Sequence, residues 1–419
     1  MKGAGVDARA ALALPVVLAL LSMLGPFAID TPFPAFDRME ADLGVGGDQM
    51  QLVVSAYLLA FGLMSPFHGP ISDAVGRRPV MVAGVCVFAL ASVGCALAPS
   101  FELLLVCRVL QGLSAGGGVI VSRTVVRDLY DGDTAQRLMS RIMMIFGVAP
   151  ALAPIVGGLL LQVGPWPLVF WFLGVLGLLL AVVVVVLLPE THPPERRLPF
   201  SARSLAGSML AVGRHGRFHV VAWAAALSFA GQFLYIGAAP IFVVDLLGLG
   251  ELDFWVFFVP MIIGLTTGAW ISGRAAGRVR RGVLVTAAMS FALAGALVGV
   301  LLAALPATRA ELPWAVLGPA LIAVGTGAAY PSQQLLLLDM FPAARGAAVS
   351  MFTFFTLVLN AVVAGAVAPL VTGSVLSMAV TSAALVGAGL ASWTAHLLTG
   401  RRARERAGAV PAPVPTESL

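Results

Sequence analysis

Two long apolar runs flank the segment His68-Gly69-Pro70-Ile71-Ser72-Asp73-Ala74-Val75-Gly76-Arg77-Arg78-Pro79-Val80. It holds an acid, two adjacent arginines, two glycines and two prolines, although only 11% of the chain is charged and 59% is hydrophobic. Soluble domains carry roughly a quarter charged residues. A chain of 419 residues with this composition cannot cover a water-facing surface. We therefore expect a membrane protein in which this segment is a short polar loop between two spans.

The apolar runs predict an all-α membrane protein. Backbone polar groups inside a bilayer must be satisfied within the protein, and a helix needs about 20 apolar residues to cross it. Runs of this length are continuous here, whereas β-barrel strands are short and alternate in polarity. Twelve such runs are predicted to span the membrane: 10–36, 50–71, 79–98, 102–124, 141–161, 167–188, 218–244, 253–273, 282–305, 313–337, 346–370 and 374–398.

The arginines predict the orientation. Alternate loops hold almost all of them, together with the N-terminus and the tail, while the remaining loops hold only Arg38 and Arg309. Because cytoplasmic loops are enriched in Lys and Arg, both termini are expected in the cytoplasm. The preference for Arg over Lys, with abundant Ala, Gly and Val, indicates a bacterial genome. We therefore expect a protein that passes many times through the inner membrane of a bacterial cell. The net charge of +5 is explained by this pattern. No nucleic-acid partner is expected.

The chain divides into two halves. We predict a six-helix bundle over 1–189, a cytoplasmic linker rich in proline and arginine over 190–217, a second six-helix bundle over 218–400, and a disordered tail over 401–419. At an offset of 206, Ser22, Gly25 and Pro34 of the first span match Ser228, Gly231 and Pro240 of the seventh. The charged loop also has a weaker echo at 268–278. The two matches together indicate duplication, which is typical of transporters with parallel repeats.

No pattern in the sequence indicates an enzyme. Cys86, Cys95 and Cys107 lie inside apolar runs, without metal-ligand spacing or a disulfide framework, and we interpret them as packing residues. No nucleophile–base pair, metal cluster or phosphate loop is present in the sequence. We expect no metal and no cofactor.

Two charged residues lie well inside predicted spans. Asp30 is in the first span, and Arg108 is in the fourth, with Gln111 one helical turn further on. A charge in hydrocarbon costs several kcal/mol, so such residues usually face a polar cavity. Both lie in the outer halves of their spans and can share one cavity. The alternative is that Asp30 lies close enough to the outer edge to be simply hydrated.

The charged loop resembles the loop 2–3 motif of the major facilitator superfamily, and most closely that of the Bcr/CflA group of bacterial drug exporters. In physical terms, Gly69 is expected to allow close helix approach, Gly76 to permit a tight turn, and Asp73 to pair with Arg77 four residues on. The resemblance implies that Asp73 caps a helix of the other half and locks the outward-open state. It also implies that Asp128 joins a cytoplasmic charge network. The alternative is that Arg77 and Arg78 only set topology.

Three further stretches resemble the same family. Asp30 followed by a proline is similar to its span 1 motif, and Arg108 to the span 4 arginine, which the resemblance ties to proton coupling. The stretch Gly147-Val-Ala-Pro150-Ala-Leu-Ala-Pro154-Ile-Val-Gly157-Gly158 resembles the antiporter motif of drug exporters. Its alternative is a generic packing face of small residues. Pro189-Glu190-Thr191 matches the usual end of span 6.

Other polar residues inside spans are candidates for lining a substrate cavity. They are Tyr57, Gln111, Gln232, Tyr235, Tyr330 and Asn360. Each can equally form a hydrogen bond between helices, and His68 is expected to be structural.

The resemblance implies a monomeric transporter that works by alternating access. It would export a small, drug-like substrate in exchange for protons, with the lipid bilayer as its surroundings. One alternative is a proton-coupled metabolite transporter of the same fold. An alternative from another class is a membrane receptor or scaffold that transports nothing.

Overall fold

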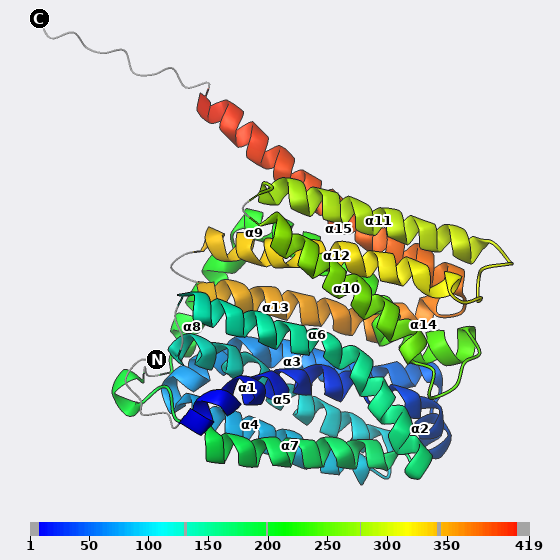
Figure 1. The fold of residues 1–419 in the computed structure, drawn as a ribbon, viewed down its shortest axis with the longest axis horizontal. Helices are drawn as coiled ribbons and strands as arrows, with labels where there is room; N and C mark the ends of the chain where they lie inside the picture. Colours follow the sequence, from blue (N-terminus) through cyan, green and yellow to red (C-terminus); the bar gives the residue numbers. More distant parts are fainter. Residues whose placement is uncertain (1–7, 130–131, 198–199, 277, 342–344, 409–419) are drawn as a thin grey trace, which may run out of the picture.

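The computed structural model describes residues 8–129, 132–197, 200–276, 278–341 and 345–408, and these contain helices and no strand (Figure 1). The first half comprises α1 Ala8–Asp30, α2 Phe36–Leu43, α3 Gly47–Val75, α4 Arg77–Ala96, α5 Phe101–Leu129, α6 Gly132–Val163 and α7 Pro167–Leu187. A short linker helix, α8 Ala202–Gly213, follows. The second half comprises α9 Gly216–Gly237, α10 Trp255–Ala275, α11 Arg281–Ala304, α12 Trp314–Met340, α13 Arg345–Val362, α14 Ala368–Val371 and α15 Val375–Gly408.

The helices confirm the membrane architecture expected from the apolar runs. Over the described ranges, eleven helices are long and apolar enough to span a bilayer. The predicted run 141–161 falls within α6, whose segment Gly147–Val163 is a shorter apolar helix. Two π-helical segments are present: η3 Ile241–Leu246 shortly follows α9, and η4 Val363–Val367 follows α13 directly. α15 ends at Gly408, beyond the bundle boundary predicted at residue 400.

The helices pack in two groups. In Figure 1, α1 to α7 occupy the lower part of the molecule and α9 to α15 the upper part. The groups meet through α3 against α13 and through α6 against α10. This grouping follows the division expected from the sequence, although the predicted boundaries at 189, 217 and 400 stay predictions.

The two halves share an apolar core at only one end. We name this end, which carries α2 and the loop after η3, the outer end, following the arginine distribution. One buried cluster there combines residues of both halves, including Phe33 and Met39 with Phe242 and Phe257. A second cluster, which includes Phe218, Phe352 and Trp393, contains residues of the linker and second half alone among the described residues. Side-chain packing therefore joins the two halves at the outer end. At the inner end, the core of the second half is separate from that of the first half.

Candidate functional site

Arg108 is anchored by a carbonyl that a proline leaves free. In an α-helix the carbonyl of residue 28 would accept the N–H of residue 32, but residue 32 is Pro32 and has none. The Ala28 oxygen instead accepts a hydrogen bond from Arg108 Nη1 at 2.8 Å. Arg108 Nε donates to the Val53 oxygen of α3 at 3.0 Å, and the Arg108 side chain is fully buried. The proline just after α1 thus leaves free the acceptor that holds a cation of α5 inside the first half.

Gln111 also holds Arg108, whose Nη2 is left without a hydrogen-bond partner. Its Oε1 accepts from Arg108 Nη1 at 2.9 Å, and its Nε2 donates to Ser92 Oγ of α4 at 2.7 Å. The Arg108 guanidinium also lies 4.6 Å from the centroid of the Tyr57 ring. Both the oxygen and the nitrogen of the Gln111 amide are hydrogen-bonded within the first half. This geometry favours the alternative that Gln111 forms an interhelical bond rather than lining a substrate cavity.

Asp30 is buried at the end of α1 and is 2% exposed. Its Oδ1 accepts no hydrogen bond, and among the described residues no cation lies within ion-pair distance of its carboxylate. Burial this deep argues against a hydrated carboxylate at the outer edge. Asp30 and Arg108 occupy the same region, because Arg108 bonds to a carbonyl two residues before Asp30, but they do not form a salt bridge.

The other predicted cavity residues are buried except for the half-buried Tyr330, and two of them have polar atoms without partners. Gln232 and Asn360, in the second half, are 1% and 2% exposed, and neither side-chain oxygen accepts a hydrogen bond. Tyr235 stacks edge-on against Phe242, and Tyr330 packs against Phe229 and Phe352.

Gln51 has the same character and was missed by the sequence reasoning. It is completely buried in α3, and neither of its amide atoms has a partner. It lies at the start of the predicted span 50–71. Gln51 lies one helical turn before Ser55, so the two polar residues share a face of α3. Ser55 contacts η4 of the second half at Gly365. This pair of polar residues on one helix face was the available sequence signal.

The charged loop forms a compact cluster around Arg77. Arg77 Nη1 lies 2.6 Å from Asp73 Oδ1, and Arg77 Nε lies 3.0 Å from Asp128 Oδ2. Ser72 Oγ accepts a further bond from Arg77 Nη1 at 2.6 Å. The predicted Asp73–Arg77 pair is therefore present, and an arginine that is 4% exposed with three partners does more than set topology. Whether Asp73 also caps a helix of the other half stays a prediction.

The two glycines of the loop differ. Gly76 has φ +112°, a conformation that side chains rarely adopt, and it forms the turn between α3 and α4 as expected. A Cβ added at Gly69 would meet nothing within 4 Å. The expectation that Gly69 permits close helix approach was wrong, because this face of α3 lies against open space.

The antiporter-like stretch of α6 contains one unconstrained glycine and two tightly packed ones. A Cβ at Gly157 would overlap the Thr31 carbonyl oxygen of α1, and one at Gly158 would lie 2.7 Å from the Glu251 carbonyl oxygen of the second half. Gly147 faces open space, so it is not part of the close packing face that the spacing predicted. Pro154 is buried and Pro150 half-buried. α6 therefore packs closely on α1 and on the second half at its outer end.

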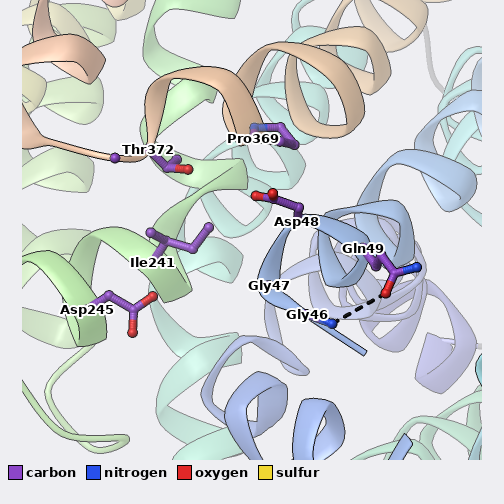
Figure 2. Close-up of a pocket in the computed structure, with 9 residues that line it drawn as sticks. Gly46, Gly47, Asp48, Gln49, Ile241, Asp245, Pro369 and Thr372 are labelled. Carbon is purple, nitrogen blue, oxygen red and sulfur yellow. Dashed lines mark hydrogen bonds between the residues drawn. The ribbon is translucent and has the colours of Figure 1, made fainter. Parts of the chain in front are cut away.

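A cavity of about 540 Å³ opens between the halves at the outer end (Figure 2). Asp48 borders it from the start of α3, and Asp245 and Ile241 border it from η3. Pro369 and Thr372, just after η4, line the remaining side. Partial burial raises the pKa of Asp245 from its usual value. One π-helical segment, η3, thus lines an open cavity that meets both halves, and residues shortly after the other, η4, line it as well.

Comparison with known proteins identifies the family. The profile of the Major Facilitator Superfamily matches residues 18–364. An uncharacterized MFS-type transporter, YdgK of Bacillus subtilis, is 33% identical over 284 residues, covering 67% of this chain and 71% of that protein. A bicyclomycin resistance protein homolog of Haemophilus influenzae is 32% identical, and multidrug resistance protein D of Escherichia coli is 33% identical. Both of these alignments cover 62% of this chain and just under two thirds, 65%, of the relative's length.

Solved structures agree in fold. A bacterial homolog of the human lysosomal transporter Spinster, in an inward-facing and unoccupied conformation, superposes with a TM-score of 0.72 at 15% identity, covering 94% of this chain and 98% of that one. A D-xylose–proton symporter gives a TM-score of 0.71 at 16% identity, covering 91% and 97%. The sequence motifs, the helical architecture and these matches lead to one conclusion: the chain belongs to the major facilitator superfamily.

Proposed function

We propose that the protein exports a small, drug-like molecule across the bacterial inner membrane in exchange for protons. The family and the fold are those of multi-pass membrane transporters, and relatives that are about a third identical are named for bicyclomycin and multidrug resistance. Because the chain belongs to a family of transporters, we favour transport over the alternative hypothesis of a receptor or scaffold. Protons serve as the coupling ion, the bilayer as the surroundings, and a monomer as the working unit.

The observation that carries the proposal is the isolated carboxylate of Asp30. An ionised carboxylate buried in the membrane without a partner costs several kcal/mol, so it must gain a proton or a cationic partner. Arg108 does not neutralise it in this arrangement: its Nε and Nη1 donate to Val53, Ala28 and Gln111, its Nη2 has no partner, and it forms no salt bridge with Asp30. In this outer-closed arrangement Asp30 is therefore suited to hold a proton and to release it as the halves rearrange.

The second half contributes polar groups for the substrate. Gln232 and Asn360 have buried oxygen atoms without partners, and Gln51 offers both an acceptor and a donor from α3. Binding a substrate with hydrogen-bonding groups would satisfy these atoms, whose burial otherwise costs about 1–3 kcal/mol each. Protonation of Asp30 and substrate binding would then stabilise different states of the transporter. The membrane potential supplies roughly 2.3 kcal/mol per charge per 100 mV.

The test is transport in proteoliposomes with an imposed pH gradient. Asp30→Asn keeps the shape of the side chain and removes its titration, and it should abolish uphill export of an uncharged drug. Glu311→Gln removes an exposed carboxylate in the loop between α11 and α12 and should export like the wild type. Full-rate export by Asp30→Asn against the substrate gradient would refute the role of Asp30. A drug-susceptibility panel in a host that lacks its own exporters would identify the substrate.

A further inference from the structure

The first turn of α4 has no capping side chain of its own. The residue at its N-cap is Gly76, so the backbone N–H groups that follow need partners from elsewhere. Arg77 N donates to Glu190 Oε1 at 3.0 Å, and Arg78 N donates to Glu190 Oε2 at 3.2 Å. A carboxylate at this position also complements the positive end of the helix dipole. Glu190, which lies 113 residues away in the chain, therefore caps α4.

The capping is reciprocal. Glu190 follows the end of α7, and His192 N donates to Glu190 Oε1 at 2.8 Å, which fixes the carboxylate. In return, Arg78 Nη2 donates to the Val185 oxygen in the last turn of α7, where carbonyls lack helical partners. The two adjacent arginines thus have different partners. Arg77 belongs to the ion cluster, and Arg78 joins α4 to α7.

The contact with Glu190 requires a residue without a side chain at position 76. A Cβ at Gly76 would lie 2.6 Å from Glu190 Oε2 and 2.8 Å from Arg197 Nη2, in addition to requiring a strained backbone. The turn can hold Glu190 this closely only because residue 76 has no side chain.

The residue after Glu190 holds the other side of the ion cluster. Thr191 Oγ1 donates to Asp128 Oδ2 at 3.1 Å, the same oxygen that receives Arg77 Nε. Glu190 therefore fixes the backbone of Arg77, and Thr191 fixes the carboxylate that Arg77 meets. Two consecutive residues at the end of α7 define both sides of the Arg77–Asp128 pair.

The same segment leads into the connection between the halves. From Glu190 the chain runs through the linker to α8, which packs against α13 of the second half. Val212 of α8 is buried in the same cluster as Phe352 of α13. The linker is thus attached at one end to the Arg77 cluster of the first half and at the other end to the second half.

We propose that Glu190 and Thr191 are positioning residues of the cytoplasmic gate, by which we mean the Arg77 cluster with Asp73 and Asp128. They set the geometry of the Arg77 cluster and transmit movement of the linker to it during the transport cycle. The proposal rests on the alternating-access function proposed above and adds a regulatory part to it. A simple helix cap would contribute stability alone, whereas a positioning residue must act through Arg77.

The test measures the conformational balance without substrate or gradient. In full-length protein whose native cysteines are replaced by alanine, Met39→Cys reports opening of the outer end through its rate of labelling with a water-soluble maleimide, because Met39 is fully buried in the outer core that the halves share. Glu190→Gln should change this rate by about fivefold, the size of effect expected from losing one helix cap. Glu195→Gln, an exposed acid in the same linker, should leave the rate unchanged.

Combination with Arg77→Gln separates positioning from stability. If Glu190 acts through Arg77, the double variant Glu190→Gln/Arg77→Gln should label at the rate of Arg77→Gln alone. Additive effects, or a lower melting temperature with an unchanged labelling rate, would overturn the proposal. If Glu190→Gln does not fold, Thr191→Val decides the matter by the same comparison. Because no substrate is used, a negative result leaves drug export untouched, and a failure of drug export leaves this result standing.

Discussion

Arg38 and Glu251 form a two-point ion pair that joins the two halves at the outer end. Arg38 Nε lies 2.8 Å from Glu251 Oε1, and Arg38 Nη2 lies 2.7 Å from Glu251 Oε2. Arg38 Nη1 also donates to the Leu161 oxygen at the end of α6 at 3.1 Å. Three segments of the outer end, α2, the end of α6 and the loop before α10, meet at this pair. Together with the shared apolar core, it closes the outer mouth.

We expect Glu251→Gln to shift the protein toward an outward-open state. Both side chains are partly exposed, so the pair contributes about 1 kcal/mol or less, and outer access should rise by no more than about fivefold. The measurement is the labelling rate of a cysteine at Met39, which is fully buried in the outer core that the halves share. Asp339→Asn is the matched control, because it breaks an exposed ion pair with Arg281 that lies within the second half. Equal effects of the two variants would show that the Arg38–Glu251 pair does not close the mouth.

We expect Pro32→Ala to weaken the anchoring of Arg108. The new N–H at residue 32 would compete for the Ala28 oxygen, which Arg108 now holds. Loss of one charge-assisted hydrogen bond costs about 1.5–3 kcal/mol, and the displaced guanidinium should impair proton-coupled export. The measurements are the melting temperature in detergent and export in proteoliposomes.

Pro15→Ala in α1 is the control for Pro32→Ala, because it makes the same chemical change at a site without a buried arginine. Export by Pro32→Ala at the rate of Pro15→Ala would contradict the proposed anchoring.

Much of the architecture could be predicted from the sequence because it depends on local patterns. Helix positions follow from continuous apolar runs, and the Asp73–Arg77 pair follows from helical spacing. The turn at Gly76 follows from a glycine between two helices. Each of these features is set by residues within a few positions of one another.

The closure of the outer end could not be predicted from the sequence, because it depends on how distant helices pack against one another. Arg38 and Glu251 are 213 residues apart, and neither carries a local signal for the other. The same spacing rule that suggested a continuous small-residue face on α6 failed at Gly147, because a helix face has a partner only over part of its length. Gln51 was missed for a similar reason, since its burial comes from packing between helices and not from its neighbours in sequence.

We expect Arg108→Lys to destabilise the first half although it keeps the charge. The guanidinium reaches acceptors on α1, α3 and within α5 at the same time, whereas a lysine ammonium is a single point and leaves at least one of them unpaired. The loss should be about 2 kcal/mol in the free energy of unfolding, with export abolished. Arg309→Lys, in an exposed loop, should be neutral in thermal unfolding. A lysine variant that matches the wild type would show that charge alone suffices.

Two glycines of α6 should respond in opposite ways to the same substitution. Gly157→Ala places a methyl group on the Thr31 carbonyl oxygen, which is backbone and cannot move aside cheaply, so it should cost about 1–3 kcal/mol and disrupt the outer contact. Gly147→Ala points into open space and should stabilise the helix by about 0.5–1 kcal/mol through its higher helix propensity. Melting temperatures in detergent and export rates of the two variants test this directly. If both substitutions abolish export without a difference in stability, the stretch acts through flexibility along its length rather than through the close contact at Gly157.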